Sequence, residues 1–354
     1  TYIGQNGGHP SDLIGAVLAA GLAKGRSGAQ MLKAIGAGTH VMLDLCDAAS
    51  AISRGWDPST YIGLSATAAL CVLEELDEEQ TAHALAMTAV SGNMLLARTG
   101  RISMWKSLAS AIAARNCLFH VELARRGLPG PDPSFSGEFG FAARISGPLE
   151  PELDIGRDRS ADSHLKFYPA VYHAQGPIEA ALDLHGRIAG QRIDSASVAI
   201  YPFAIRYTAD DPAKWAPKTV ETATHSLPFI VAHVLLHGEF SEAGLRRSLQ
   251  DADVLALAQK IEVKGEESLG ARWPEATPSR IVVSASGVTF EKSIEHIIGH
   301  DRRPLGLKEV EAKFRMAAEP YCGWDKAEAW LHRIMRFPDL VIASDCAAAM
   351  NPLM

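Results

Sequence analysis

The chain has 354 residues, enough for about two domains with buried cores. Its residues are 47% hydrophobic and 21% charged, as in ordinary globular proteins, which excludes the disordered and fibrous classes. The net charge of −7 gives no reason to bind nucleic acid or an anionic membrane. The longest apolar stretches, residues 63–73 and 227–236, are too short to span a bilayer.

The cysteines indicate a reducing compartment. There are five, widely scattered and without any Cys-x-x-Cys pair: Cys46, Cys71, Cys117, Cys322 and Cys346. An odd, sparse set argues against a disulfide framework, a zinc ribbon or an iron–sulfur cluster. The first residues do not resemble a signal peptide, so we expect a cytoplasmic protein. The chain also begins without methionine, so its first residue need not be the native N-terminus.

The first third of the chain is predicted to form successive helices, because apolar residues recur there at a spacing of three to four. The expected helices cover residues 10–24, 27–53, 58–75, 78–96 and 103–126. Asp77 and Gln80 have the spacing of a capping box. Asp57 is an expected N-cap before Pro58, and Gly127 is expected to end the fifth helix.

Residues 128–163 are rich in Gly, Pro, Asp and Ser and are predicted to form a connection. Beyond it we expect helices at 176–188, 226–237 and 251–261, one or two strands within 192–208, and a hairpin at 280–294 that turns at Ser286-Gly287. Helices are predicted again from Leu307 onward, and residues 343–350 are mostly small. The predicted fold is mainly α with an α+β part. A large helical domain of residues 1–164 and 304–354 is interrupted by a smaller α+β domain of residues 165–303.

Generic motifs predict no metal site. His233 and His237 are four residues apart, and so are His296 and His300, which is half of a metal site. Neither pair has a glutamate at the position that zinc proteases use, and no third ligand is evident. We therefore expect packed or surface histidines and no metal.

Two helix starts in the first third contain groups suited to binding a carboxylate. His9 precedes Pro10 at a helix N-terminus, where free N–H groups converge on an anion. A simple cap by Ser11 or Asp12 is the alternative. Lys106 begins a helix of small residues whose tight packing should hold the ammonium partly away from water. An exposed lysine in the first turn is the alternative there.

Two further stretches combine polar groups near the predicted domain junction. Residues 165–175 include Lys166, Tyr168 and His173, and clefts between domains are where ligand sites concentrate. A polar linker is the alternative. His225 stands at another helix start, where Thr224 or Ser226 would equally serve as a cap.

In this order the stretches resemble the MmgE/PrpD family, which includes 2-methylcitrate dehydratase, cis-aconitate decarboxylase and iminodisuccinate epimerase. The matching residues cover essentially the whole chain: His9-Pro10-Ser11-Asp12, Gly55-Trp56, Lys106, Lys166 with Pro169-Ala170 and His173, His225-Ser226-Leu227-Pro228, Ile298-Gly299-His300 and Lys313-Phe314. The resemblance implies a helical domain with an inserted α+β lid, a homodimer, an active site in the interdomain cleft, and no metal, cluster or other cofactor. Chains of the family usually have a further helical stretch before the histidine–proline motif, so we expect part of the first domain to lie outside this numbering.

The family acts on di- and tricarboxylates, so its sites must stabilise negative charge beside an ionised carboxylate. The resemblance implies Lys106 and Lys166 as carboxylate clamps and His9 and His173 as acid–base groups. It leaves open which histidine is the acid and which is the base. Asp12, Tyr168 and His225 would bind substrate or orient these groups.

Two departures from the decarboxylase-like pattern favour dehydration. That pattern has histidines at the positions of Asp57 and Val171, whereas the dehydratase-like pattern has its histidine two residues later, at His173. We therefore expect a hydro-lyase that resembles 2-methylcitrate dehydratase. Epimerisation, decarboxylation and a catalytically inactive, dicarboxylate-binding protein remain the alternatives.

Overall fold

The structure, a computed structural model, describes residues 1–96, 104–149, 158–341 and 345–347. Its described residues fall into two compact units. Unit 1 contains those within Thr1–Ala97, Trp105–Ser163 and Gly306–Met354, and unit 2 contains those within Arg98–Met104 and His164–Leu305. The predicted division into two domains stays a prediction, because compactness does not show that either part folds independently.

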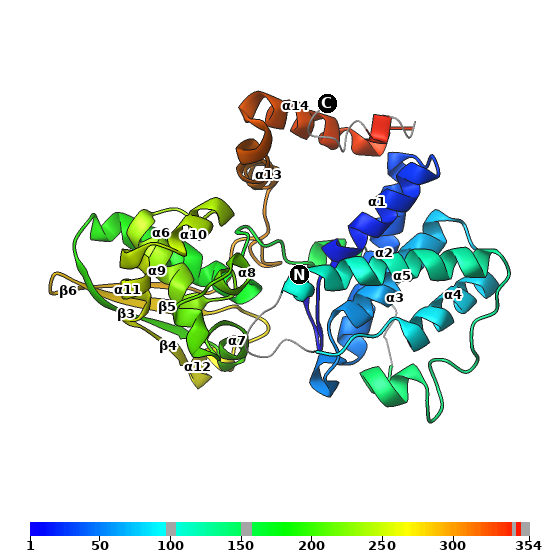
Figure 1. The fold of residues 1–354 in the computed structure, drawn as a ribbon, viewed down its shortest axis with the longest axis horizontal. Coiled ribbons are helices and arrows are strands. Elements are labelled where there is room, and N and C mark those ends of the chain that lie inside the picture. Colours follow the sequence, from blue (N-terminus) through cyan, green and yellow to red (C-terminus); the bar gives the residue numbers. More distant parts are fainter. Residues whose placement is uncertain (97–103, 150–157, 342–344, 348–354) are drawn as a thin grey trace. The chain divides into compact units, whose positions relative to one another are not determined.

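Unit 1 is built around one buried helix. After a short pair of strands, β1 (Tyr2–Ile3) and β2 (Gly7–Gly8), come α1 (Ile14–Ala23), α2 (Gly28–Ala48), α3 (Ser59–Leu73), α4 (Glu78–Ser91) and α5 (Ala109–Arg125). Every residue of α3 except Ala68 and Val72 is buried. A helix that is apolar on all sides belongs in a core. Accordingly, α3 packs against α1, α2, α4 and α5 (Figure 1).

Local capping signals fix the ends of these helices. The Asp77 side chain accepts the backbone N–H of Gln80 in the predicted capping box. The N-cap residue of α3 is Pro58, one residue after the expected Asp57, but the Asp57 carboxylate accepts the N–H of Ser59 at 2.9 Å. Gly127, at φ +83°, follows the last turn of α5 in the left-handed conformation that ends many helices. The five helices are confirmed with different bounds: α1 begins at Ile14, α2 ends at Ala48, α4 ends at Ser91 and α5 begins at Ala109. Residue 103, the predicted start of the fifth helix, lies outside the described residues.

The predicted connection, as far as it is described, contains two short helical turns, Ala142–Ser146 and Arg159–Asp162. Arg159 is buried and forms ion pairs with Asp44 at 2.5 Å and Asp47 at 2.7 Å, both on α2. A guanidinium with two carboxylate partners holds the end of this segment on unit 1. The C-terminal helices α13 (Leu307–Cys322) and α14 (Trp324–Met335) pack against each other. Of the small-residue run at 343–350, only residues 345–347 are described.

Unit 2 contains a mixed four-stranded sheet in the order β4-β3-β5-β6. Its strands are β3 (Ile193–Ile200), β4 (Ile261–Gly265), β5 (Ser279–Ala285) and β6 (Val288–Ile294). β3 and β4 are parallel, and the other pairs are antiparallel. The predicted hairpin is confirmed, because Ser286 (φ +48°) and Gly287 (φ +80°) form the turn between β5 and β6.

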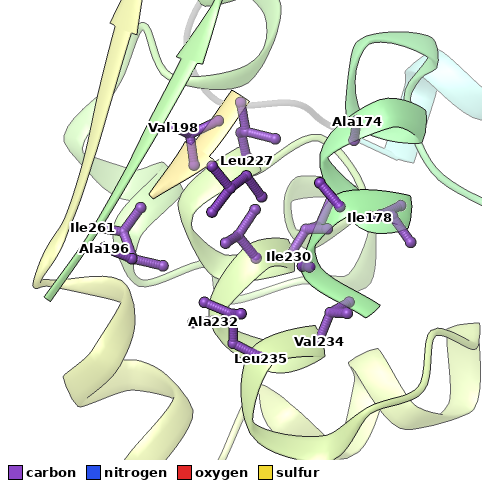
Figure 2. Packing of buried hydrophobic residues seen from close by; sticks show 14 of the residues in the cluster. Ala174, Ile178, Ala196, Val198, Leu227, Ile230, Ala232, Val234, Leu235 and Ile261 are labelled. Atoms are coloured by element: carbon purple, nitrogen blue, oxygen red, sulfur yellow. The ribbon is translucent and has the colours of Figure 1, made fainter. Parts of the chain in front are cut away.

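Helices α6 (Gln175–Ile188) and α9 (Leu227–His237) pack against each other and against the sheet. Figure 2 shows the resulting core, in which apolar side chains of α6, α9, β3 and β4 meet. Short helices complete the unit: α7 (Pro202–Thr208), α8 (Val220–Ala223), α10 (Glu242–Ser248), α11 (Ala252–Ala258) and α12 (Glu267–Gly270). The chain is thus mainly helical with a small mixed sheet, as predicted at the level of fold class.

Two predicted elements change type part of the way along. Residues 192–208 form β3 followed by a helix, because Pro202 removes a strand donor and begins α7. The predicted helix at 251–261 ends at Ala258, and Ile261 already belongs to β4. Within the described residues, no helix is both long and apolar enough to cross a membrane.

Candidate functional site

The stretch that contains Lys166 and His173 is held in shape by a buried amide. Gln175 is fully buried, and its side chain accepts the N–H of Tyr168 at 2.9 Å and donates to the Tyr168 carbonyl at 3.0 Å. These two hydrogen bonds fix the turn between residues 168 and 175. Ala174, between His173 and Gln175, lies in the apolar core shown in Figure 2, so the backbone next to His173 is held on both sides.

His173 is buried among aromatic rings. The rings of Tyr201, Phe203, Tyr207 and Trp273 have centroids between 5.4 and 5.8 Å from its imidazole. Burial, reinforced by the positive charge of Lys166, lowers the pKa of His173 to about 3. His173 is therefore neutral at physiological pH, with a cationic group close enough to affect its titration.

The neighbouring tyrosine selects one tautomer of this neutral ring. Tyr201 is buried, burial raises its pKa well above 10, and the one hydrogen-bond partner of its hydroxyl among the described residues is His173 Nδ1, at 2.6 Å. If the hydroxyl oxygen accepted a hydrogen bond from Nδ1–H, the hydroxyl's own hydrogen would be buried without an acceptor, which costs free energy of folding. The hydroxyl therefore donates to Nδ1, and the ring hydrogen of His173 is on Nε2. In this form His173 offers a hydrogen-bond donor, while its basic lone pair is occupied.

The third and fourth predicted stretches come together in unit 2. The N–H of Val171 donates to the carbonyl of Thr224 at 3.0 Å, which joins the two segments next to His173 and His225. The His225 ring lies against local acceptors, the Glu221 carbonyl at 3.0 Å and the Thr224 hydroxyl at 3.1 Å. Ser226 caps α9 through the N–H of Phe229, so the capping alternative is confirmed for this helix start.

Tyr168 lies on a different part of the turn from the His173 ring. Its aromatic contacts are with Phe167 and Phe240, whereas His173 contacts the rings named above. Burial raises the pKa of Tyr168 to about 12, so its hydroxyl stays protonated. Its predicted role in orienting substrate stays a prediction.

In unit 1 the first two stretches are joined by a hydrogen bond between helices. Asp12 Oδ2 accepts the hydroxyl hydrogen of Ser110, on α5, at 2.6 Å. The alternative of a simple cap by Ser11 or Asp12 is wrong, because the helix begins with a tight turn at Pro10–Leu13 and its N-cap residue is His9, without a side-chain capping bond. His9 is half-buried, and its Nδ1 lies 3.2 Å from the Thr1 hydroxyl. Lys106 is also half-buried, in the turn Met104–Leu108 that precedes α5.

The histidine pairs differ in their surroundings. His233 bonds to the Ser248 hydroxyl at 2.8 Å and His237 to Asp251 at 3.0 Å, as packed and surface histidines do. The His300 ring, however, lies tilted against the His164 ring with a centroid distance of 4.1 Å, and both lie beside Asp301. The spacing of four residues could not reveal this arrangement, because His164 is distant in the sequence.

Several residues at the His173 site were not predicted, namely Tyr201, Trp273 and the clamping role of Gln175. Gln175 stood within the polar stretch of residues 165–175, so its position was noted without its function. Tyr201 and Trp273 come from other parts of unit 2, and nothing in their local sequence points to His173.

Two parts of the chain match the models of one protein family. The MmgE/PrpD N-terminal domain matches residues 1–154, and the MmgE/PrpD C-terminal domain matches residues 168–335. A 2-methylcitrate dehydratase of Cupriavidus necator is 25% identical over 89% of this chain and 70% of its own length. The cis-aconitate decarboxylase of Homo sapiens is 24% identical over 91% of this chain and 68% of its own length. A 2-methylcitrate dehydratase of Escherichia coli K12 is 23% identical over 89% of this chain and 71% of its own length. With both family domains matched along nearly its whole length, the chain belongs to the MmgE/PrpD family.

Proposed function

We propose that this protein is a cofactor-independent hydro-lyase that dehydrates a small tricarboxylate, converting 2-methylcitrate to 2-methyl-cis-aconitate and water. The observation that supports it best is the neutral His173 beside the cationic Lys166. A neutral imidazole that donates from Nε2, next to an ammonium, suits a carboxylate that gains negative charge during the reaction. The roles that we give to the individual site residues below belong to the same proposal.

The dehydration requires removal of a proton from carbon, loss of the neighbouring hydroxyl, and formation of a carbon–carbon double bond. Lys166 and Lys106 bind substrate carboxylates. His173 donates a hydrogen bond from Nε2 to the oxygen that becomes more negative as the proton leaves. His9 is the base, since the Nδ1 lone pair of His173 is occupied by Tyr201. The proton that His9 takes from carbon is returned through solvent to the departing hydroxyl, which leaves as water, so His9 is again neutral and the reaction balances.

Dehydration is favoured over decarboxylation at two positions. Asp57 stands where decarboxylase-like sequences have histidine, and its carboxylate lies at the start of α3. Val171 stands at the other position, and its N–H is bonded to Thr224. Val171 has no ionisable side chain, and the Asp57 carboxylate is engaged by the N–H of Ser59. The relatives named 2-methylcitrate dehydratase support the same choice, and we extend the proposal to a homodimer.

The test is an ultraviolet assay of the purified protein with 2-methylcitrate, citrate and cis-aconitate, with and without chelator. A chelator-resistant rise in the absorbance of a conjugated alkene, fastest with 2-methylcitrate, is the expected result. Carbon dioxide release from cis-aconitate would replace the proposal with decarboxylation. Deuterium exchange at an α-carbon without alkene would replace it with epimerisation, and ligand binding without either reaction would identify an inactive homologue.

A further inference from the structure

Unit 2 contains a group of metal-binding side chains that the proposed reaction does not use. His164, His300 and Asp301 each present a ligand atom, and these three atoms lie within 4.8 Å of one another. The two histidines are 7% and 2% exposed, while the Asp301 side chain is 47% exposed. Two buried imidazoles therefore face a carboxylate that reaches solvent.

The backbone brings these residues together from distant parts of the chain. The N–H of Leu165 donates to the Gly299 carbonyl at 2.8 Å, which sets the neighbouring residues His164 and His300 side by side. Gly299 has φ +87°, and a Cβ there would lie 1.9 Å from the Leu165 carbonyl oxygen, so the close approach requires glycine. The turn at residues 300–303 is closed by a hydrogen bond from Arg303 N–H to the His300 carbonyl at 2.9 Å. The geometry of the three side chains is thus set by the fold.

The hydrogen bonds of the two rings leave room for a cation. His164 Nδ1 is bonded to the Tyr172 hydroxyl at 2.5 Å, and His164 Nε2 lies 3.4 Å from Asp301 Oδ1. A ring nitrogen with an outer hydrogen-bond partner and its other nitrogen directed at a carboxylate is typical of metal-ligating histidine. A separation of 3.4 Å between donor atoms fits two ligands at about 2.1 Å from one tetrahedral ion.

A second observation concerns His300. Its Nδ1 contacts the Asp301 carboxylate and lies 3.2 Å from the backbone nitrogen of Arg302, while its Nε2 is buried and has no hydrogen-bond partner. With the ring hydrogen on Nδ1 and donated to Asp301, Nε2 presents its lone pair to an ion. Nδ1 of the neighbouring His296 is also buried without a partner, and the two rings lie 4.8 Å apart. Buried ring nitrogens without partners are uncommon in folded proteins and call for an unseen water or ion.

From these observations the geometry points to a divalent transition-metal site, formed by His164, His300 and Asp301, that takes an ion of the Zn²⁺ class. Two nitrogens and one carboxylate oxygen favour zinc and its neighbours over Mg²⁺ and Ca²⁺, which prefer oxygen ligands. The exposed side of Asp301 leaves a position for water. The ion would hold the first residue of unit 2 to the turn that follows β6, and it has no part in the proposed dehydration.

The experiment is metal binding by the full chain after removal of metal with chelator and desalting. Zn²⁺ is titrated by calorimetry, and Co²⁺ provides visible absorption that reports nitrogen and oxygen ligands around the ion. We expect one ion per chain, binding more than about 100-fold weaker in Asp301→Asn and His164→Gln, and a rise in thermal midpoint with Zn²⁺ that Asp301→Asn loses.

His237→Gln is the matched control, because His237 and Asp251 form a surface histidine–aspartate pair without a third ligand among the described residues. Its Zn²⁺ affinity should equal that of the original chain. Circular dichroism without metal checks that each variant is folded. If His164→Gln unfolds, the half-exposed Asp301→Asn still decides the question. Absence of binding, equal affinity in Asp301→Asn, or an equal loss in His237→Gln would overturn the assignment.

Discussion

The hydroxyl oxygen of Tyr201 lies 2.6 Å from His173 Nδ1, while the ring of the same tyrosine stacks on Trp273 at a centroid distance of 4.2 Å. One side chain thus contributes packing through its ring and a hydrogen bond through its oxygen. Because these contributions come from different atoms, a single substitution can separate them.

Tyr201→Phe should keep the stacking and remove the donor to Nδ1. The His173 ring then loses the bond that holds its hydrogen on Nε2, so we expect kcat to fall about 10- to 100-fold with little change in KM. Nitrogen NMR of His173 should show a change in tautomer. Tyr207→Phe is the control, since the Tyr207 ring also lies near His173, at 5.4 Å, and the structure gives its hydroxyl no bond to Nδ1. Equal rates in the two variants would contradict a positioning role for Tyr201.

Lys166→Met should affect both titration and turnover. Without the ammonium, the pKa of His173 rises, but it stays below its ordinary value because burial is the larger cause of the shift. Loss of a carboxylate clamp should lower kcat/KM by at least about 100-fold. Proton NMR of the imidazole and steady-state kinetics measure the two effects. Arginine at this position should restore part of the substrate affinity, because it returns the positive charge.

Acid should destabilise the protein through His173. Its pKa is about 3 in the folded chain and about 6.5 when unfolded, so the unfolded state binds the additional proton between these values. Stability from the neutral ring is fully present above pH 6.5 and is lost as the pH falls toward 3. The slope is at most about 1.4 kcal/mol per pH unit for this one group. Urea unfolding between pH 7 and 4 should give a shallower slope for His173→Gln, and identical slopes would show that His173 is not held neutral by the fold.

Gly299→Ala should destabilise unit 2 by about 2–3 kcal/mol. The new methyl group would meet the Leu165 carbonyl at 1.9 Å, and the residue would also have to keep φ +87°. Gly25→Ala separates the two costs, since Gly25 has φ +71° and nothing within 4 Å of its would-be Cβ. The Gly25→Ala variant should lose only about 1–2 kcal/mol of the free energy of unfolding. Equal losses in denaturant titrations would mean that the loop relieves the contact with Leu165.

Features that depend only on residues close together in the sequence, such as helix caps and tight turns, were predicted correctly. Asp77 and Gln80 cap a helix through atoms three residues apart, and Ser286-Gly287 turns a hairpin, so a short window of sequence suffices for both. The alternation that predicted a strand continued through Phe203 and Ile205. There Pro202 and the packing of α7 produced a helix instead.

The candidate site depends on contacts between residues that are far apart in the sequence, which a short stretch of sequence cannot reveal. Tyr201 reaches His173 across 28 residues of sequence, and His164 meets His300 only because a glycine lets two backbone segments approach. The stretches at His9, Lys106, Lys166 and His225 could be recognised by their residue types. Their hydrogen-bond partners, and hence the tautomer of His173, required the fold.

The outer strands of the unit 2 sheet also affect how the protein behaves at high concentration. On β4, Glu262 and Lys264 form an exposed ion pair at 2.7 Å, and on β6 the carbonyl of Glu291 already accepts Arg187 at 2.8 Å. An incoming strand from another molecule would have to desolvate the first pair and displace the second contact. Both outer strands therefore oppose pairing with a strand of another molecule.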